Sequence, residues 1–279
     1  MGFREAFDSI ERAAAERIKV EQGDYEVDGL LYCGKCHTPK QTRVTILGQE
    51  RKPMCLCRCA AAQKEEEDAA YKRTEFEKKV KDLRRMAFAD DEMQKWTFDT
   101  DDGKNRKLSK VARNYVTNFK ELHLAGKGLL LYGGVGVGKT FAAVCIANAL
   151  IDKGTPCMVT SFTRLLNVIG GIFEGKQEQI DQLNSFPLMV IDDLATQRST
   201  EYAEELVYNV IDSRYRAGLP LIVTTNLTGA QLQNPDTAQK QRIYSRLYEM
   251  CVPIKCEGED RRKNKLLEET ERYKKLLGV

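Results

Sequence analysis

The sequence predicts an α/β fold in which helices cover both faces of a parallel sheet. From Leu129 onwards, short apolar runs typical of buried strands alternate with segments of helical periodicity. The first apolar run leads into a glycine-rich turn and then a helix, the order found in phosphate-binding loops. The expected strands are 129–132, 157–161, 188–193 and 221–226, and the expected helices are 141–151, 162–169 and 201–216.

The glycine-rich turn matches the GxxxxGK[ST] pattern of a P-loop. Glycines let successive backbone N–H groups point at phosphate oxygens, and the following helix adds its N-terminal donors. Lys139 is expected to reach the β- and γ-phosphates of ATP, and the Thr140 hydroxyl is expected to bind Mg²⁺. A glycine turn without a ligand does not account for the full pattern between a strand and a helix. The expected nucleotide contacts are Gly133, Gly134, Val135, Gly136, Val137, Gly138, Lys139, Thr140 and Phe141.

Polar side chains end the later strands, at the sheet edge where open α/β sheets bind ligands. Asp192 is expected to support Mg²⁺, and Asp193 is expected to polarise the attacking water. Asn226 ends the next strand and is expected to position that water, although Thr-Thr-Asn alone is also typical of a strand end and turn. Trp96 and Phe98, upstream of the P-loop, are equally compatible with an adenine pocket and with ordinary core.

Five of the nine cysteines lie between residues 33 and 59, where a CxxC pair, a predicted hairpin and a second cysteine cluster indicate a zinc-ribbon-like module. Such a small segment cannot build a large core, so a structural Zn²⁺ is favoured over a redox role. His37 is a further candidate ligand. The expected ligands are Cys33, Cys36, Cys57 and Cys59, with Cys55 as the alternate.

Three regions are expected: an N-terminal helix with the cysteine module (1–60), a charged helical linker (61–94) and a nucleotide-binding domain (95–279). The N-terminal helix is predicted from apolar residues spaced between Phe3 and Ile18. A long helix from Ala60 to about Ala87 is predicted to carry one apolar stripe, formed by Phe76, Val80, Leu83 and Met86.

Charge and hydropathy exclude several classes of protein. Forty-four basic residues are nearly cancelled by forty-one acidic ones, giving a net charge of +3, so any DNA contact must be a local patch. The sequence has no signal-peptide pattern and no apolar run long enough to cross a bilayer, so we expect a cytoplasmic protein with no membrane partner.

The P-loop, the Val190–Leu194 segment, the strand ending in Asn226 and the segment Arg242–Leu247 together resemble the AAA+ ATPases of DnaC/DnaI-type replicative helicase loaders. That family also includes IstB-type transposition helpers. The resemblance covers roughly residues 95–265. It implies that Arg246 is an arginine finger acting on a neighbouring subunit and that Arg262 is the sensor 2 arginine.

The sequence departs from the family pattern at three positions. Asp193 stands where a glutamate is common, so slow hydrolysis is expected. Ala195 replaces a frequent glycine. Arg261 stands where relatives often have an aromatic residue, which leaves open the choice between the two neighbouring arginines.

The resemblance implies an ATP-dependent loader. Its N-terminal module would bind the replicative DNA helicase, and its AAA+ domain would bind ATP with Mg²⁺, self-associate and engage single-stranded DNA. Two alternatives remain, an IstB-type transposition helper and an ATP-binding adaptor with negligible turnover.

Overall fold

The computed structural model describes residues 20–46, 48–88, 90–171, 175–194 and 200–278. The chain divides into two compact units, residues 1–77 (the N-terminal unit) and 78–279 (the C-terminal unit). The helix predicted between Phe3 and Ile18 and the departure at Ala195 both lie outside the described residues.

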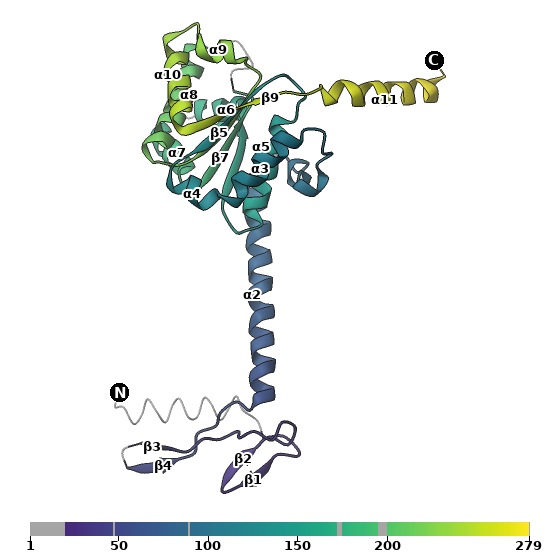
Figure 1. Ribbon diagram of the computed structural model, residues 1–279. Coiled ribbons are helices and arrows are strands. Elements are labelled where there is room, and N and C mark those ends of the chain that lie inside the picture. The colour runs from purple at the N-terminus through teal and green to yellow at the C-terminus, as the bar shows by residue number, and fades with distance from the viewer. Residues whose placement is uncertain (1–19, 47, 89, 172–174, 195–199, 279) are drawn as a thin grey trace. The chain divides into compact units, whose positions relative to one another are not determined.

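The N-terminal unit contains two small antiparallel hairpins (Figure 1). Strand β1 (Tyr25–Val27) pairs with β2 (Leu30–Tyr32), and the rings of Tyr25 and Tyr32 stack with their centroids 5.9 Å apart. Strands β3 (Val44–Ile46) and β4 (Gln49–Arg51) form the second hairpin, which confirms the hairpin predicted between the two cysteine clusters. A few short strands bury little apolar surface, so other interactions must hold this unit together.

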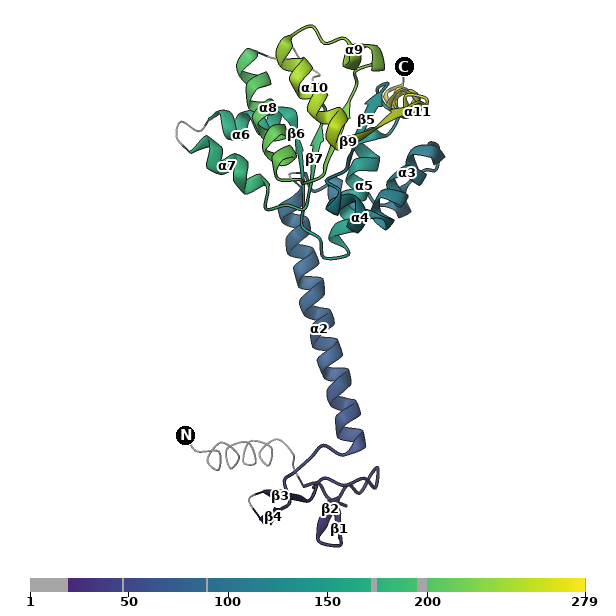
Figure 2. The ribbon, with the colours of Figure 1, turned by 60° about the vertical axis from the view of Figure 1, so that its left-hand side comes forward.

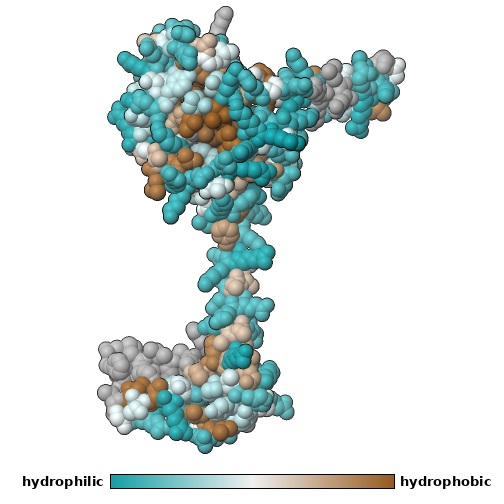
Figure 3. All heavy atoms as spheres, in the orientation of Figure 1, coloured by the Kyte–Doolittle hydropathy of each residue, from teal (hydrophilic) through white to brown (hydrophobic). Residues whose placement is uncertain are grey.

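Helix α2 (Arg58–Ala87) confirms the long helix predicted for this region, and the boundary between the two units falls within it. Its composition of alanine and charged residues favours a helix, and the ion pair between Arg73 and Glu77 spans one turn. Figure 3 shows that the visible surface of α2 is mostly hydrophilic. Within the predicted stripe only Val80 and Leu83 pack against the core of the C-terminal unit. Phe76 and Met86 are exposed.

The C-terminal unit is built on a five-stranded parallel sheet, which confirms the predicted parallel sheet and adds one strand to the four expected. The strand order β6-β7-β8-β5-β9 places the P-loop strand β5 between β8 and β9. The strands are β5 (Gly128–Gly133), β6 (Cys157–Ser161), β7 (Leu188–Asp192), β8 (Leu221–Thr225) and β9 (Cys251–Cys256). Strand β9 was not predicted, because Pro253 interrupts its apolar pattern. Proline is tolerated there because β9 lies at the edge of the sheet.

Helices cover both faces of this sheet (Figure 2). Alternate side chains of each strand point to opposite faces, so Leu129 and Leu131 join one buried cluster and Leu130 joins the other. The first cluster includes residues of α3 (Arg106–Thr117) and α5 (Lys139–Ile151). The second includes residues of α6 (Phe162–Gly170), α7 (Lys176–Leu183), α8 (Glu201–Arg216) and α10 (Ala238–Met250).

Further elements complete the C-terminal unit. These are η1 (Met93–Lys95), η2 (Phe98–Thr100), α4 (Phe119–Leu124), α9 (Gly229–Gln233) and the C-terminal helix α11 (Arg261–Leu277). Among the described residues, no helix has both the length and the apolar character that a bilayer span requires.

Candidate nucleotide-binding site and metal centre

The P-loop connects the end of β5 to the start of α5. Gly138 is the N-cap of α5 and has a φ of 96°, a left-handed conformation that favours glycine. Gly136 has a φ of 73°, and a Cβ atom there would overlap the carboxylate of Asp260. The backbone N–H of Arg261 also donates to the carbonyl of Gly136 (3.2 Å). Glycine at position 136 therefore lets the start of α11 pack directly on the P-loop.

A cavity of about 390 Å³ lies beside this loop, within the size range of small-molecule sites. The aromatic rings of Trp96 and Phe141 lie 5.9 Å apart. The buried amide of Asn148 holds the backbone near Trp96 by donating to the carbonyls of Met93 and Trp96 (2.9 Å each). The cavity is lined by Trp96, Val135, Gly136, Gly138, Lys139, Thr140, Phe141, Asp193, Asn226, Arg261 and Arg262.

The Lys139 side chain is buried and points along the loop. Its ammonium group donates to the carbonyls of Gly133 (3.0 Å) and Gly134 (2.6 Å) and to Oδ1 of Asn226 (2.8 Å). Burial lowers the pKa of Lys139, because a charged ammonium loses hydration there. These acceptors hold the ammonium at the cavity, where it can meet a phosphate.

Asp192 ends β7 and lies between two hydroxyl groups. Its Oδ1 accepts hydrogen bonds from Oγ1 of Thr140 (2.8 Å) and from Oγ1 of Thr224. Burial raises the pKa of this carboxyl, and the two hydroxyl donors oppose that shift. A carboxylate beside a threonine hydroxyl supplies the hard oxygen donors that suit Mg²⁺.

Asp193 lies at the turn after β7 with a φ of 55°, an unusual conformation for a residue other than glycine. Its backbone N–H donates to Oγ1 of Thr224 (3.0 Å), and its Oδ1 accepts a long hydrogen bond from Nδ2 of Asn226 (3.4 Å). The structure therefore brings Lys139, Thr140, Asp192, Asp193 and Asn226 together at one sheet edge. The contribution of Thr224 was not anticipated from the sequence.

Both neighbouring arginines at the start of α11 line the cavity. The Arg261 guanidinium forms an ion pair with Asp102 (3.0 Å). Asp260 caps the helix by accepting from the backbone N–H of Arg262 (3.0 Å). Arg261 and Arg262 therefore both lie at the cavity, and the assignment of the sensor 2 arginine stays a prediction.

Arg246 is not among the residues that line the cavity. Its Nε donates to Oδ1 of the buried Asp212 (3.2 Å), and its guanidinium stacks over the ring of Tyr215, 4.2 Å from the centroid. A further ion pair joins Arg246 to Glu249 (3.6 Å). Asp212 also pairs with Arg216 (2.7 Å), so one buried carboxylate holds two arginines.

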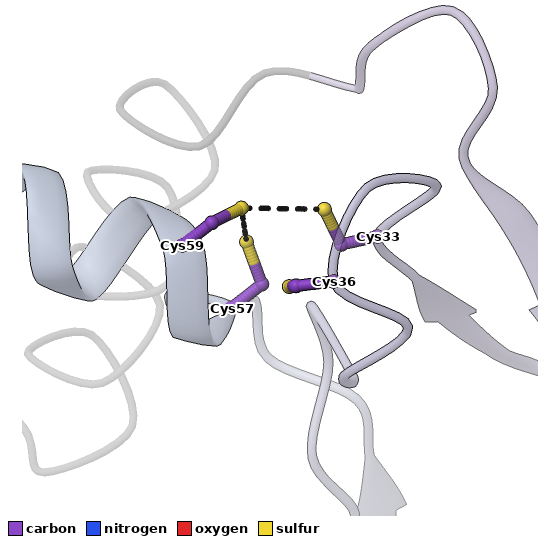
Figure 4. Close-up of side chains that lie close together, drawn as sticks. All are labelled: Cys33, Cys36, Cys57 and Cys59. Atoms are coloured by element: carbon purple, nitrogen blue, oxygen red, sulfur yellow. Dashed lines mark hydrogen bonds between the residues drawn. The ribbon is translucent and has the colours of Figure 1, made fainter.

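Four cysteines of the N-terminal unit form a tight group (Figure 4). Their Sγ atoms all lie within 4.8 Å of one another, and Cys59 lies 3.6 Å from Cys33 and 3.4 Å from Cys57. The group consists of the four ligands expected from the sequence, Cys33, Cys36, Cys57 and Cys59. Four sulfur donors at this spacing suit a tetrahedral Zn²⁺.

Two other candidates for this site are engaged elsewhere. The Cys55 thiol contacts the carbonyl of Pro39 (3.6 Å), and Nδ1 of His37 is hydrogen bonded to the hydroxyl of Tyr25 (3.0 Å). Neither residue belongs to the sulfur group.

Neighbouring groups shift the pKa values of Cys36 and Cys59 in opposite directions. A hydrogen bond from the hydroxyl of Thr38 lowers the pKa of Cys36 to about 5. Hydrogen bonds with Cys57 and Cys33 raise the pKa of Cys59 to about 12, so the group shares its protons unequally.

The CxxC turn is held by Asp24, whose Oδ1 accepts from the backbone N–H of Gly34 (3.1 Å) and whose Oδ2 pairs with the buried Lys40 (2.6 Å).

The parallel sheet, the P-loop and the convergent acidic and amide side chains define an ATP-binding P-loop protein with the AAA+ fold. The chain belongs to the family of IstB-like ATP binding proteins, whose family model matches residues 65–268. The matched segment begins after the cysteine group.

Curated relatives include two helicase loaders. The chain is 27% identical over 149 residues to the replicative helicase loader DnaI of Bacillus subtilis, covering 49% of this chain and 48% of that protein. It is 23% identical over 150 residues to the replicative helicase loader DnaC of Escherichia coli K12, covering 52% of this chain and 58% of that protein. The chain thus spans about half the length of these relatives.

Another relative comes from a mobile element. An ATP-binding protein in an insertion sequence of Mycobacterium tuberculosis is 29% identical over 104 residues, covering 37% of this chain and 41% of that protein.

Solved structures agree with the fold. A crystal structure of DnaI matches with a TM-score of 0.51 at 23% identity, covering 64% of this chain and 98% of that chain. A crystal structure of the DnaC helicase loader matches with a TM-score of 0.52 at 25% identity, covering 60% of this chain and 100% of that chain.

Proposed function

We propose that this protein is an ATP-dependent loader that delivers a replicative DNA helicase onto single-stranded DNA. The observation that carries the proposal is the convergence of Lys139, Asp193 and Asn226 on one cavity, in a chain similar to named helicase loaders. ATP binding and hydrolysis act as the switch between a helicase-holding state and a releasing state.

Residues in and beside the cavity have separate roles in ATP hydrolysis. Lys139 exchanges its backbone carbonyl acceptors for the β- and γ-phosphates. Thr140 and Asp192 would hold Mg²⁺, which would supply positive charge beside the phosphates. Asp193 accepts a proton from the attacking water, and Asn226, hydrogen bonded to Asp193, orients that water.

Self-association of the chain brings a further positively charged side chain, Arg246, to the nucleotide of a neighbouring subunit. Arg246 does not line the nucleotide cavity of its own chain. We propose that its guanidinium acts on the γ-phosphate bound by a neighbouring subunit. Arg262 lies at the cavity of its own chain and would contact the γ-phosphate bound there. Assembly and ATP binding are then coupled, because each stabilises the other.

The cysteine group makes the N-terminal unit a structural zinc module. Zn²⁺ bound to Cys33, Cys36, Cys57 and Cys59 replaces the apolar core that the short hairpins lack. We assign helicase binding to this module, because the family match does not extend over it and the ATPase fold is shared with proteins of other function.

A second candidate function is that of a transposition helper. The family match and the relative from an insertion sequence favour it. A third possibility is an adaptor that binds ATP with negligible turnover.

ATP turnover with and without single-stranded DNA separates these functions. A loader shows turnover that single-stranded DNA alters and that Lys139→Ala abolishes. An adaptor shows no turnover that depends on Lys139. A transposition helper responds to duplex DNA and does not co-purify with a replicative helicase.

A further inference from the structure

Thr224, which lies two residues before Asn226, contacts both acidic residues of the nucleotide site. It is fully buried in β8, the strand next to β7. Its hydroxyl donates to Oδ1 of Asp192 and accepts from the backbone N–H of Asp193 (3.0 Å). A hydroxyl has one proton and two lone pairs, so it can make both bonds at once.

The two bonds fix different parts of the site. The bond to Asp192 helps to hold the carboxylate oxygen that also accepts from Thr140. The bond to Asp193 holds a backbone with a φ of 55°, which costs free energy and persists only where the surroundings enforce it. The carbonyl of Thr224 also accepts from the backbone N–H of Leu194 (2.9 Å), so the turn is tied to β8 at two consecutive residues.

We propose that Thr224 is a positioning residue that sets the Asp192 carboxylate for Mg²⁺ and the Asp193 side chain for the attacking water. The inference rests on the proposed ATPase site and adds a residue to it. Thr224 is fully buried and does not line the cavity, so it acts through the two aspartates. Loss of a group that orients a metal-binding carboxylate typically reduces metal affinity about 10- to 100-fold.

The chain provides a matched control in the adjacent residue. Thr225 is also fully buried, and its hydroxyl donates to the carbonyl of Leu194 (2.7 Å) and accepts from the N–H of Leu227 (3.2 Å). Both partners among the described residues are backbone groups. Thr225→Val therefore removes a buried hydroxyl without removing a bond to either aspartate. Thr224→Ser keeps the hydroxyl and tests for rescue.

The test uses the full chain and three measurements: binding of a fluorescent ATP analogue as Mg²⁺ is titrated, ATP turnover, and thermal unfolding without nucleotide. We expect Thr224→Val to need about tenfold more Mg²⁺ for half-maximal binding and to lose about tenfold or more in kcat. Thr224→Ser and Thr225→Val should keep the Mg²⁺ requirement of the unmodified protein. If Thr224→Val does not fold, Thr224→Cys replaces it with the same expected direction, because a thiol is a weak hydrogen-bond donor.

An unchanged Mg²⁺ requirement in Thr224→Val overturns the positioning role. An equal shift in Thr225→Val also overturns it, because the effect would then be general loosening of β8. If the unmodified chain binds no ATP, or Lys139→Ala binds it equally well, the proposed ATPase site fails and the role of Thr224 fails with it. If the unmodified chain turns over ATP and Thr224→Val has the same Mg²⁺ requirement and kcat, the Thr224 proposal is refuted and the proposed ATPase site stands.

Discussion

The ammonium of Lys139 donates a 2.8 Å hydrogen bond to Oδ1 of Asn226, joining the P-loop to the end of β8. The same amide reaches Asp193 through Nδ2. One side chain thus links the phosphate-binding lysine to the residue proposed to activate water. We expect bound phosphate to compete with this amide for Lys139, which would leave Asn226 free to hold water against Asp193.

Replacing Asn226 with alanine should separate binding from hydrolysis. We expect Asn226→Ala to bind ATP with an affinity within a few-fold of the unmodified protein, because the phosphates are held by the loop and Lys139. Its kcat should fall roughly 100-fold, because a preorganised polar group is lost from the reacting water. Steady-state turnover and nucleotide binding measure the two effects. The control is Asn234→Ala, at an exposed asparagine whose side chain donates to the carbonyl of Ala230. Unchanged kcat in Asn226→Ala would refute the role.

The two arginines held by Asp212 should differ in their effect on turnover. Arg246→Ala should lower kcat about tenfold or more in assembled protein and leave dilute, unassembled protein unaffected, because the guanidinium acts on the neighbouring subunit. Arg216→Ala, which removes the other partner of the same carboxylate, should keep turnover near that of the unmodified protein. Turnover measured across protein concentrations checks this. An equal loss in dilute protein would show that Arg246 does not act in trans.

Of the two arginines at the start of α11, Arg262 should matter more for ATP hydrolysis. Arg261 is held by Asp102 in a 3.0 Å ion pair, which partly neutralises its charge. We expect Arg262→Ala to reduce kcat at least several-fold and Arg261→Ala to have the smaller effect. Turnover assays of the two variants side by side compare their losses of kcat. A larger loss in Arg261→Ala than in Arg262→Ala would assign the sensing role to Arg261.

The cysteine group should hold about one zinc ion per chain. Cys36→Ser should lose the metal and destabilise the N-terminal unit, since a structural metal contributes directly to folding. Cys55→Ser should keep the metal, because the Cys55 thiol contacts Pro39 and lies outside the sulfur group. Elemental analysis of protein purified without chelator gives the zinc content. Metal-free unmodified protein, or equal loss in both variants, would rule out the proposed ligand set.

The residues that could be predicted from the sequence share a local signature. Lys139 and Thr140 belong to a contiguous loop motif, and Asp192 and Asn226 each end an apolar strand, so parallel strands bring them to one edge. The cysteine group was predictable because metal-ligand spacing is itself a local pattern.

The remaining features depend on tertiary contacts. Thr224 lies inside a strand, where threonine is common for its β propensity, so the pattern gives no sign of its bonds to two aspartates. The ion pair of Arg261 with Asp102 and the contact of Asp260 with Gly136 join segments distant in sequence. The ion pair between Asp212 and Arg246 joins helices α8 and α10, and the sequence does not specify how these helices pack.

Co-purification with the replicative helicase of the same organism tests the loader proposal most directly. We predict that the full chain binds the helicase, that removal of residues 1–60 abolishes binding, and that Lys139→Ala alters ATP-dependent release without preventing binding. A full chain that does not bind the helicase, with or without ATP, would contradict the proposal.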